Sequence, residues 1–270
     1  MPTLDQNMRA WDETYKWIDQ GDEWSRAWGG PSAQWFGTIL PRLRSFVPAK
    51  TILEIAPGYG RWTQFLRELC QNLILVDISP KCIEVCRTRF AAFTGIEYHV
   101  NDGQSLAMIG DDSIDLAFSF DSLVHVELDV LLGYLAQLAH KLTPDGVAFI
   151  HHSNIGEFVD ESTGKLPPEI VNRHWRALSV SAEKVERACE GLGLRCVSQE
   201  LINWGGTELI DSFTVVSQPG ARWSGETVLV RNTEFNAEVK YVRRLAALYD
   251  WGRMARGASL PEPQVSDPER

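Results

Sequence analysis

The sequence is poor in features that would tie it to an oxidising compartment, a metal cluster or a membrane. Its 270 residues include five cysteines, an odd number without CxxC spacing, which argues against a disulfide framework and against a cysteine zinc site. No apolar run approaches membrane-spanning length, and residues 1–11 lack the pattern of a secretory signal. We therefore expect a cytoplasmic protein with free thiols and no membrane span.

Positive charge is also scarce. The chain has 26 Lys and Arg against 36 Asp and Glu, a formal net charge of −10. A nucleic-acid partner held by phosphate contacts would need a basic face, so this class of partner is disfavoured. Hydrophobic residues make up 44% of the chain, enough to bury a full core, and we expect one domain with additions.

From Thr51 onward, short apolar runs alternate with amphipathic stretches. Strands separated by helix-length segments indicate right-handed βαβ units and a mainly parallel sheet covered on both faces. The expected strands are 51–55, 73–76, 96–100, 114–120, 147–151, 194–202, 212–216 and 227–231, and the expected helices are 61–70, 80–93, 128–142, 181–191 and 236–251.

Three segments depart from this alternation. Residues 1–45 have helical pieces broken at glycine and proline, and we expect them to form a helical cap or lid on a main domain spanning 46–255. Residues 153–178 are polar and too long for an ordinary loop, which predicts an insertion after strand five that folds over a binding site. The tail 256–270 is rich in proline and charge and is expected to be flexible.

The run EIAPGYG at 54–60 closes the first expected strand and opens a helix. Gly58 and Gly60 let the backbone turn sharply and approach a ligand, and the helix start offers free N–H groups. Such a turn can also be only a tight turn. NAD-type dehydrogenases also use a glycine turn in this architecture and are the main alternative class. Their motif GxGxxG is absent here, because Arg61 and Thr63 stand where the last glycine would be.

Carboxylates at the following strand ends strengthen the case for a nucleotide cofactor. Asp77 ends the second strand at the offset where a carboxylate meets a ribose diol in doubly wound folds. Asp102 and Gly103 follow the third strand, at a position that suits an adenine contact. Each carboxylate alone is more often a helix cap than a ligand. Glu54, Asp77 and Asp102 stand at the ends of three successive strands, which is hard to explain by capping.

These motifs resemble those of class I S-adenosylmethionine-dependent methyltransferases. TILEIAPGYG at 51–60 is similar to their first motif, with Ala56 where many members carry glycine. LVDIS around Asp77 is similar to the second motif, residues 101–106 to the third, 113–121 to the fourth and 142–150 to the turn into strand five. The resemblance covers about residues 45–152 in order and spacing.

The resemblance implies S-adenosyl-L-methionine as cofactor and a Rossmann-like sheet of seven strands with a reversed terminal hairpin. The residues it places at the cofactor are Glu54, Ala56, Gly58 and Gly60 at the methionine part, Asp77 at the ribose, and Asp102 with Gly103 near the adenine.

Side chains that follow strands four and five are expected to face the reaction centre. An alcohol must lose its proton as it attacks, and histidine is the natural base near neutral pH. His125 and His152 are the candidate bases, with His125 equally well explained as a pocket wall, and Asp121 would orient the base or a metal. Strand alternation sends His151 and His152 to opposite faces. Asp121 with His151 is also a candidate ligand pair for Mg²⁺, which would orient vicinal hydroxyls.

Aromatic residues suggest the acceptor. Half of the ten tryptophans lie in the first 35 residues, at positions that form no single helical stripe. They fit a hydrophobic cap as well as a ligand pocket, where amphipathic rings suit stacking on a pyranose. GYGRWT at 58–63 with HHSN at 151–154 also resembles, more loosely, bacterial enzymes that O-methylate sugars of polysaccharides and glycosylated metabolites.

Three hypotheses follow. The leading one is an O-methyltransferase that uses a histidine base on a hydroxyl of a sugar or glycosylated acceptor, so the expected partner is a small-molecule or saccharide acceptor. The second is a methyltransferase of a peptide or polyketide natural product or of a small amine, for which a base is less needed. The third is a non-catalytic cofactor-binding scaffold. The acceptor, the metal and the oligomeric state stay open, and a homodimer is one option.

Overall fold

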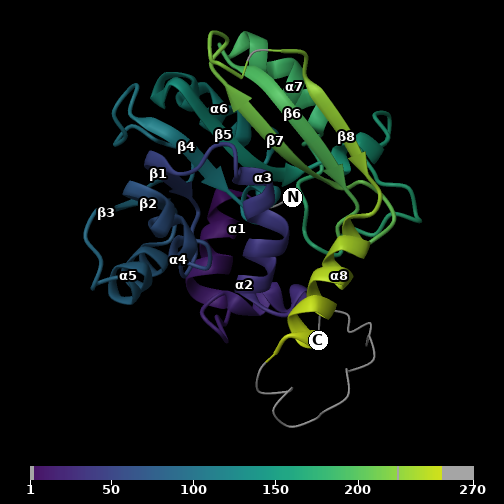
Figure 1. Ribbon diagram of the computed structural model, residues 1–270. Coiled ribbons are helices and arrows are strands. Elements are labelled where there is room, and N and C mark those ends of the chain that lie inside the picture. The colour runs from purple at the N-terminus through teal and green to yellow at the C-terminus, as the bar shows by residue number, and fades with distance from the viewer. Residues whose placement is uncertain (1–2, 224, 251–270) are drawn as a thin grey trace.

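A single mixed sheet of eight strands forms the centre of the molecule in the computed structural model, which describes residues 3–223 and 225–250 (Figure 1). The strand order is β3-β2-β1-β4-β5-β7-β6-β8. The strands are β1 Ala49–Ile55, β2 Cys70–Asp77, β3 Ile96–Val100, β4 Ile114–Ser119, β5 Leu142–Ser153, β6 Arg195–Ile202, β7 Asp211–Ser217 and β8 Val228–Asn232. The tail 256–270, expected to be flexible, lies outside the described residues.

The pairing of the strands confirms the Rossmann-like α/β fold and corrects the expected number of strands. Strands β1 to β5 pair in parallel, as βαβ units require, while β7 is antiparallel to both β5 and β6. The seven-stranded sheet implied by the family resemblance is wrong. The run expected at 227–231 forms β8, which pairs in parallel with β6 and adds an eighth strand at the edge.

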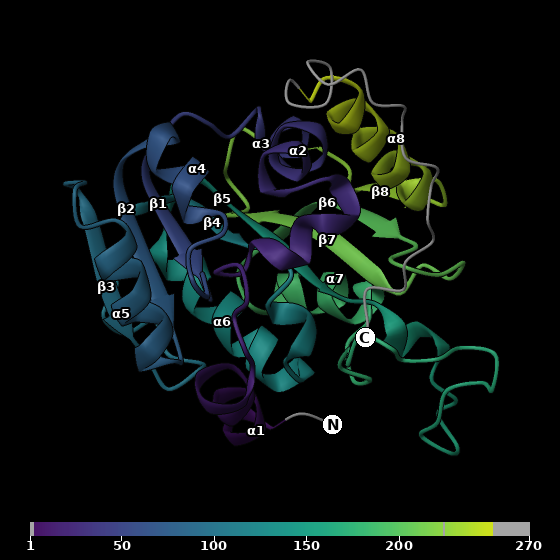
Figure 2. The ribbon, with the colours of Figure 1, turned by 90° about the horizontal axis from the view of Figure 1, so that it is seen from below.

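Helices cover both faces of the sheet. The α-helices are α1 Leu4–Met8, α2 Pro31–Gln34, α3 Leu40–Leu43, α4 Thr63–Leu66, α5 Pro80–Arg89, α6 Leu128–Lys141, α7 Ala182–Gly191 and α8 Phe235–Leu248. The 3₁₀- and π-helical segments are η1 Arg9–Thr14, η2 Asp22–Trp28, η3 Trp35–Ile39, η4 Arg67–Leu69, η5 Leu123–His125 and η6 Ile155–Phe158. Figure 2 shows α6 and α7 on one side of the sheet and α2, α3 and α8 on the other.

Alternating side chains of the strands supply the two halves of the core. Leu53 and Ile55 of β1 face the cluster that includes α6 and α7, whereas Ile52 faces the cluster that includes α5, Trp35 and Phe235. The helix expected at 61–70 is shorter than predicted because β2 already begins at Cys70. Ser181 caps α7, since its hydroxyl accepts a hydrogen bond from the Lys184 N–H.

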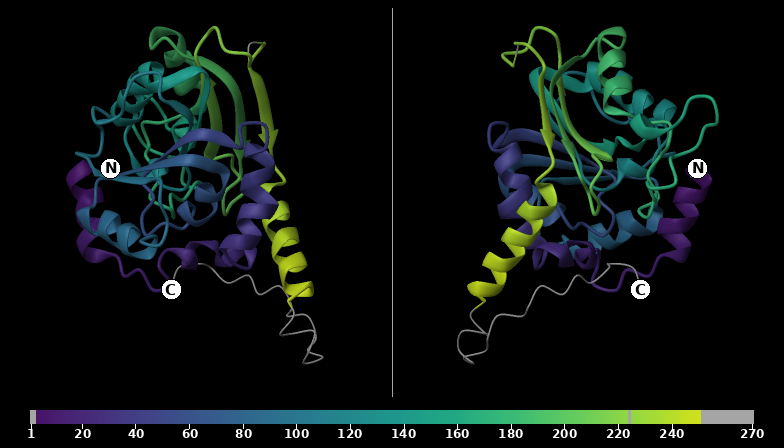
Figure 3. Two further views of the ribbon diagram at one scale, coloured as in Figure 1. Left: turned by 60° about the vertical axis from the view of Figure 1, so that its left-hand side comes forward. Right: turned by 90° about the vertical axis from the view of Figure 1, so that its right-hand side faces the viewer.

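The segment before β1 and the last helix pack against each other. Figure 3 shows α8 beside α2 and α3. Gly37 in η3 is a point of close approach, because a Cβ there would lie 2.7 Å from both methyl groups of Val242 in α8. Within the described part of the chain, no helix is both long and apolar enough to span a membrane.

We predict that Gly37→Ala lowers the free energy of unfolding by about 1–3 kcal/mol, because the added methyl group overpacks the contact with Val242. Gly133→Ala is the matched control: Gly133 lies inside α6 with open space at its Cβ position, so alanine should stabilise by about 0.4–1 kcal/mol. Denaturant unfolding measures the free energy of unfolding of the two single variants and of the double variant that combines Gly37→Ala with Val242→Ala. Equal effects at the two glycines, or no relief in the double variant, would contradict the close packing.

Candidate active site

The turn after β1 has the backbone geometry of a ligand-binding loop. Ala56, Gly58 and Gly60 all have positive φ angles, of 58°, 58° and 84°. A Cβ at Gly58 would lie 2.8 Å from the ring of Trp17, and one at Gly60 would lie 2.5 Å from the ring of Phe90. Glycine at these two positions is therefore required by conformation and by space, and Trp17 of the N-terminal segment rests on the turn.

Glu54, near the end of β1, is buried beneath this turn. One carboxylate oxygen accepts a hydrogen bond of 2.6 Å from the Thr63 hydroxyl, and the other, Oε1, has no partner among the described atoms. Burial raises the pKa of Glu54 to about 8. A buried carboxylate with one free oxygen is suited to receive a cationic group from a ligand.

Asp77 lies at the end of β2, where the sequence placed it, and faces the same turn. Its carboxylate accepts hydrogen bonds from the Gly58 N–H at 3.1 Å and the Ser79 N–H at 2.8 Å. Burial raises the pKa of Asp77 to about 6, against the lowering effect of these two N–H groups. Asp12 of η1 accepts from the Ser79 hydroxyl at 2.5 Å and from the Lys81 N–H at 3.2 Å, so the N-terminal segment is fastened beside Asp77.

Asp102 and Gly103 form a tight turn after β3. Asp102 Oδ1 accepts hydrogen bonds from the N–H groups of Gln104 and Ser105, and Gly103 has a φ of 85°. A Cβ at Gly103 would lie 2.6 Å from Ile78 and 3.0 Å from Leu4. The backbone here therefore lies directly against the loop that follows Asp77 and against α1.

Asp121, after β4, is held between two arginines. Its Oδ2 accepts from Arg61 Nη2 at 3.1 Å, and its Oδ1 lies 3.9 Å from Arg176 Nη2. Burial by itself would raise the pKa of Asp121, but the guanidinium groups of Arg61 and Arg176 outweigh it and hold that pKa below its usual value. Asp121 is therefore ionised at neutral pH.

Arg176 also pairs with Asp211 at the start of β7. Its Nε donates to Asp211 Oδ1 at 2.9 Å and its Nη2 donates to Oδ2 at 2.7 Å, a bidentate pair buried from solvent. Burial would raise the pKa of Asp211, but Arg176 and His151 lower it far below its usual range. Arg61, Asp121, Arg176 and Asp211 thus form a row of buried charges of alternating sign, which we call the ion-pair row.

His151 of β5 ends this row and uses both ring nitrogens. The backbone N–H of Asp121 donates to His151 Nδ1 at 3.1 Å, so the ring proton is on Nε2, which lies 3.1 Å from Asp211 Oδ2. The expected Mg²⁺ ligands, Asp121 and His151, therefore do not fit a divalent cation. Two guanidinium groups face Asp121, His151 has no free lone pair, and the described residues contain no group of three side chains arranged to bind a metal.

His152 points to the opposite face of β5, as strand alternation requires. Its Nδ1 lies 2.8 Å from the Ser153 carbonyl oxygen and its Nε2 lies 2.7 Å from the Thr214 hydroxyl, with no exposed surface. Burial lowers the pKa of His152 to about 4. The structure thus separates His152 from Asp121 and His151, and both of its ring nitrogens already have partners.

His125 lies at the end of η5 with one ring nitrogen left without a proton. Its Nδ1 is 3.1 Å from the carbonyl oxygen of Trp175, so Nδ1 carries the proton and Nε2 carries the lone pair. Burial, reinforced by the charge of Arg176, lowers the pKa of His125 to about 4. The ring centroids of Trp11 and Trp175 lie 5.5 Å and 5.9 Å from that of His125.

The five N-terminal tryptophans divide into two groups. Trp28 and Trp35 are buried in the core with α3 and α8. Trp11, Trp17 and Trp24 instead gather around Tyr15, with centroid separations from its ring of 5.2 to 5.6 Å. Trp17 also stacks on Tyr59 of the glycine turn at 4.3 Å. We call Trp11, Tyr15, Trp17 and Trp24 the aromatic cluster. It reaches from the glycine turn to His125.

Sequence reasoning missed three members of the ion-pair row: Arg61, Arg176 and Asp211. Arg61 lies beside the glycine turn, where the sequence indicates only that the turn lacks a GxGxxG motif. Arg176 lies in the segment 153–178, where no periodic pattern gives a side chain its direction. Asp211 opens β7, and an acidic residue at the start of a buried strand was the one signal available.

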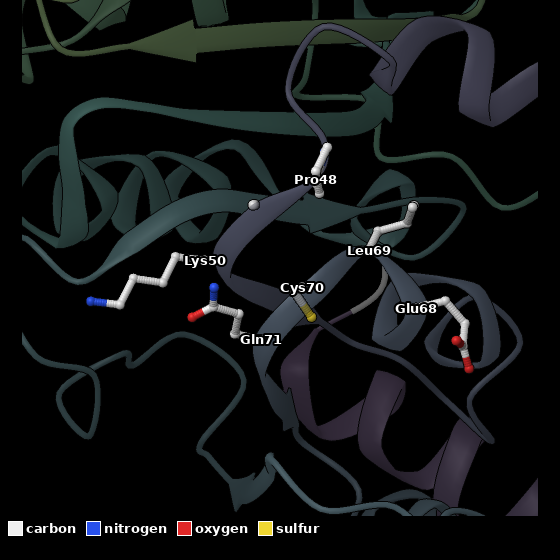
Figure 4. A pocket seen from close by; sticks show the side chains of 7 residues that line it. Pro48, Lys50, Glu68, Leu69, Cys70 and Gln71 are labelled. Atoms are coloured by element: carbon white, nitrogen blue, oxygen red, sulfur yellow. The ribbon is translucent and has the colours of Figure 1, made fainter.

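A surface pocket of about 360 Å³ lies at the other end of the sheet. Figure 4 shows the side chains around it, which belong to Pro48, Ala49, Lys50, Glu68, Leu69, Cys70 and Gln71. These residues begin β1 and β2, whereas the glycine turn and Asp77 follow the ends of the same strands. The pocket is therefore not part of the candidate active site.

Comparisons with known proteins agree with this geometry. The family described as a methyltransferase domain matches residues 52–146. The PH0226 protein of Pyrococcus horikoshii OT3 has a similar structure, with a TM-score of 0.54 and 19% identity over 78% of this chain and 95% of its own. A search of the curated proteins finds no match.

Two further solved structures have a similar fold. An S-adenosylmethionine-dependent methyltransferase of Mesorhizobium loti has a TM-score of 0.50 and 18% identity, covering 68% of this chain and 97% of its own. The N-methyltransferase NodS of Bradyrhizobium japonicum WM9, solved with S-adenosyl-L-homocysteine, has a TM-score of 0.52 and 18% identity, covering 80% and 96%. At these identities the structures establish the fold, and the matched domain establishes the class of activity.

We predict that Arg176→Met and Asp211→Asn each lower the free energy of unfolding by about 3–5 kcal/mol, because each leaves a buried charge without its partner. The double variant should lose clearly less than the sum of the two, since neither charge remains. Urea denaturation of the four proteins gives the coupling energy. Strictly additive losses would show that the pair does not act as a unit.

Proposed function

We propose that this S-adenosylmethionine-dependent methyltransferase transfers its methyl group to a hydroxyl of a sugar or glycosylated acceptor, with His125 as general base. The observation that carries the proposal is the state of His125. Its Nδ1 proton is committed to the Trp175 carbonyl, and burial lowers its pKa to about 4, so Nε2 is free of a proton at neutral pH. An amine or a carboxylate acceptor would need no such base.

The residues around the glycine turn fit the cofactor S-adenosyl-L-methionine. The amino-acid end of this molecule carries an ammonium and a carboxylate group. Glu54 Oε1 and Arg61 Nη1 are both buried and lack partners among the described atoms, and they offer one acceptor and one donor of opposite charge. We assign Glu54 to the ammonium and Arg61 to the carboxylate. The backbone of Ala56, Gly58 and Gly60 lies beside them.

The nucleoside end is assigned to two further strand ends. Asp77 uses each carboxylate oxygen for one N–H group, and each oxygen can accept a second hydrogen bond, from a ribose hydroxyl. Asp102 and Gly103 are assigned to the adenine. The bound cofactor supplies a methyl group on a sulfonium, which is already activated toward a nucleophile.

The protein's own part in the reaction is to orient the acceptor and to take its proton. His125 Nε2 receives the hydroxyl proton as the oxygen attacks, and the Trp175 carbonyl stabilises the protonated ring through Nδ1. Asp121 acts by positioning, since its carboxylate holds Arg61 and its N–H fixes the ring of His151. His152 has no role in this proposal, because both of its nitrogens are occupied in the core.

The aromatic rings around His125 support a sugar acceptor. Trp11 and Trp175 flank the imidazole, and Trp24 of the aromatic cluster keeps 41% of its surface exposed. Flat indole rings bind the apolar faces of a pyranose and leave its hydroxyls to polar neighbours. An amine acceptor is the second candidate, because a protein with a similar fold, NodS, is an N-methyltransferase.

We predict that the protein adds the mass of one methyl group to a member of a panel of mono- and oligosaccharides, with no change when a chelator is present. In His125→Ala, turnover should fall by about 10²–10⁴-fold, the usual contribution of a general base, while S-adenosyl-L-homocysteine still binds. Mass spectrometry measures the product and calorimetry the binding.

His140→Ala is the matched control, because His140 is exposed on α6 away from the glycine turn, and its turnover should equal that of the wild type. Methylation of amines instead of sugars, at a rate that survives in His125→Ala, would refute the proposal. Cofactor binding without product from any acceptor would support the scaffold hypothesis.

We predict that cofactor binding releases a proton near neutral pH. Burial raises the pKa of Glu54 to about 8 in the free protein, and an ammonium group beside Oε1 would lower it. Affinity should therefore rise with pH from about 6 to 8 and then level off. Calorimetry in buffers of different ionisation enthalpy measures the released proton, and Glu54→Gln should abolish it. A proton count of zero in the wild type would contradict the role of Glu54.

A further inference from the structure

The edge strand β8 leaves three consecutive apolar side chains uncovered. Val228, Leu229 and Val230 keep 57%, 55% and 46% of their surfaces exposed. Successive residues of a strand point to opposite faces, so both faces of β8 are apolar and open. In the strand order β8 comes last, so within the described residues β6 is its sole strand neighbour.

Edge strands of this kind are usually protected against pairing. Proteins protect them with lysine, proline, a bulge or a covering segment. The run Glu226 to Asn232 reads ETVLVRN and contains neither lysine nor proline, and its pairing with β6 runs from Val228 to Asn232 without a register shift. The strand has no bulge in its pairing with β6, is apolar and can accept another strand on its outer edge.

We infer that this edge pairs with the same edge of a second copy of the chain, in antiparallel orientation about a two-fold axis through Leu229. Residues at equal distances on either side of Leu229 have similar polarity: both are apolar at 228 and 230, and all are polar at 226, 227, 231 and 232. A two-fold interface requires such a match, because it pairs these positions with one another. In this register Leu229 faces its own copy and Val228 faces Val230 of the other chain. Thr227 then lies opposite Arg231, and Glu226 opposite Asn232.

Neighbouring registers are less complementary. A two-fold axis through Val228 would place Glu226 opposite Val230, and an axis through Val230 would place Arg231 opposite Leu229. Each would bring a charged side chain against an apolar one, whereas the axis through Leu229 matches apolar with apolar and polar with polar and opposes no like charges. Arg231 also lies 3.7 Å from Glu157 of its own chain, and both side chains remain exposed.

The helix that follows β8 adds a second exposed apolar row. Tyr241, Leu245 and Leu248 of α8 lie one and two turns apart and keep 63%, 39% and 42% of their surfaces exposed. A strand pair alone buries less than the roughly 1,600 Å² of a typical stable complex. Each copy also carries a net charge of −10. We therefore expect a concentration-dependent dimer that salt strengthens.

Cysteine crosslinking tests the register. Leu229→Cys places the new thiol opposite its own copy, at the separation a disulfide spans, and should form a covalent dimer under mild oxidation at least about tenfold faster than Val230→Cys. Val230→Cys is the matched control, because its thiol faces Val228. The pair Val228→Cys and Val230→Cys in one chain should restore crosslinking. The wild type sets the background, since four of its five cysteines are buried and Cys70 is partly so.

Light scattering of the full chain tests the dimer itself, and Leu229→Lys should shift it to monomer while S-adenosyl-L-homocysteine still binds. A wild type that is monomeric at all concentrations would overturn the inference, and so would equal crosslinking of the two single cysteine variants. Protection of those β8 amides that point away from β6, if it does not vary with concentration, would overturn it too, since a segment of the same chain would then cover the edge. None of these results depends on the acceptor or on His125.

Discussion

The buried pair of Arg176 and Asp211 is the contact on which the carboxyl edge of the sheet depends. It fastens the irregular segment after β5 to β7, and through the peptide next to Arg176 it sets the Trp175 carbonyl that orients His125. On its other side Arg176 approaches Asp121, which holds Arg61 against the glycine turn. Both halves of the candidate site are therefore held by one chain of charges, which is stable only while each has its partner.

Much of the fold follows from local patterns. Buried strands such as β1 and β4 are recognisable in the sequence as short apolar runs, because both of their faces are buried. Helices such as α6 are recognisable by the regular spacing of apolar residues, because one face is buried. The sheet has eight strands and not the seven that the family resemblance implies. Residues 227–231 favour a strand by their own pattern, and they form β8, for which a seven-stranded sheet has no place. The chain's own pattern was the better guide there.

The candidate site was less predictable. Strand ends located the glycine turn and Asp77, because the topology alone brings them together. Alternation correctly separated His151 from His152, but which of them faces Asp121 depends on how β5 pairs with β4 and β7. The pairing of Arg176 with Asp211 joins residues that no repeat connects, and desolvated charges of this kind are visible only once the chain has folded.

The contacts of Asp12 tie the N-terminal segment to the same loops that carry the candidate cofactor residues. Asp12 binds the start of α5 through Ser79 and Lys81 while Trp17 rests on Gly58, so the same stretch of chain closes the turn from two sides. Hydrogen bonds of this kind contribute about 0.5–1.5 kcal/mol each. The stretch from Asp12 to Trp17 therefore joins the loop after Asp77 to the turn after β1, so the first residues of the chain contribute directly to the walls of the candidate site.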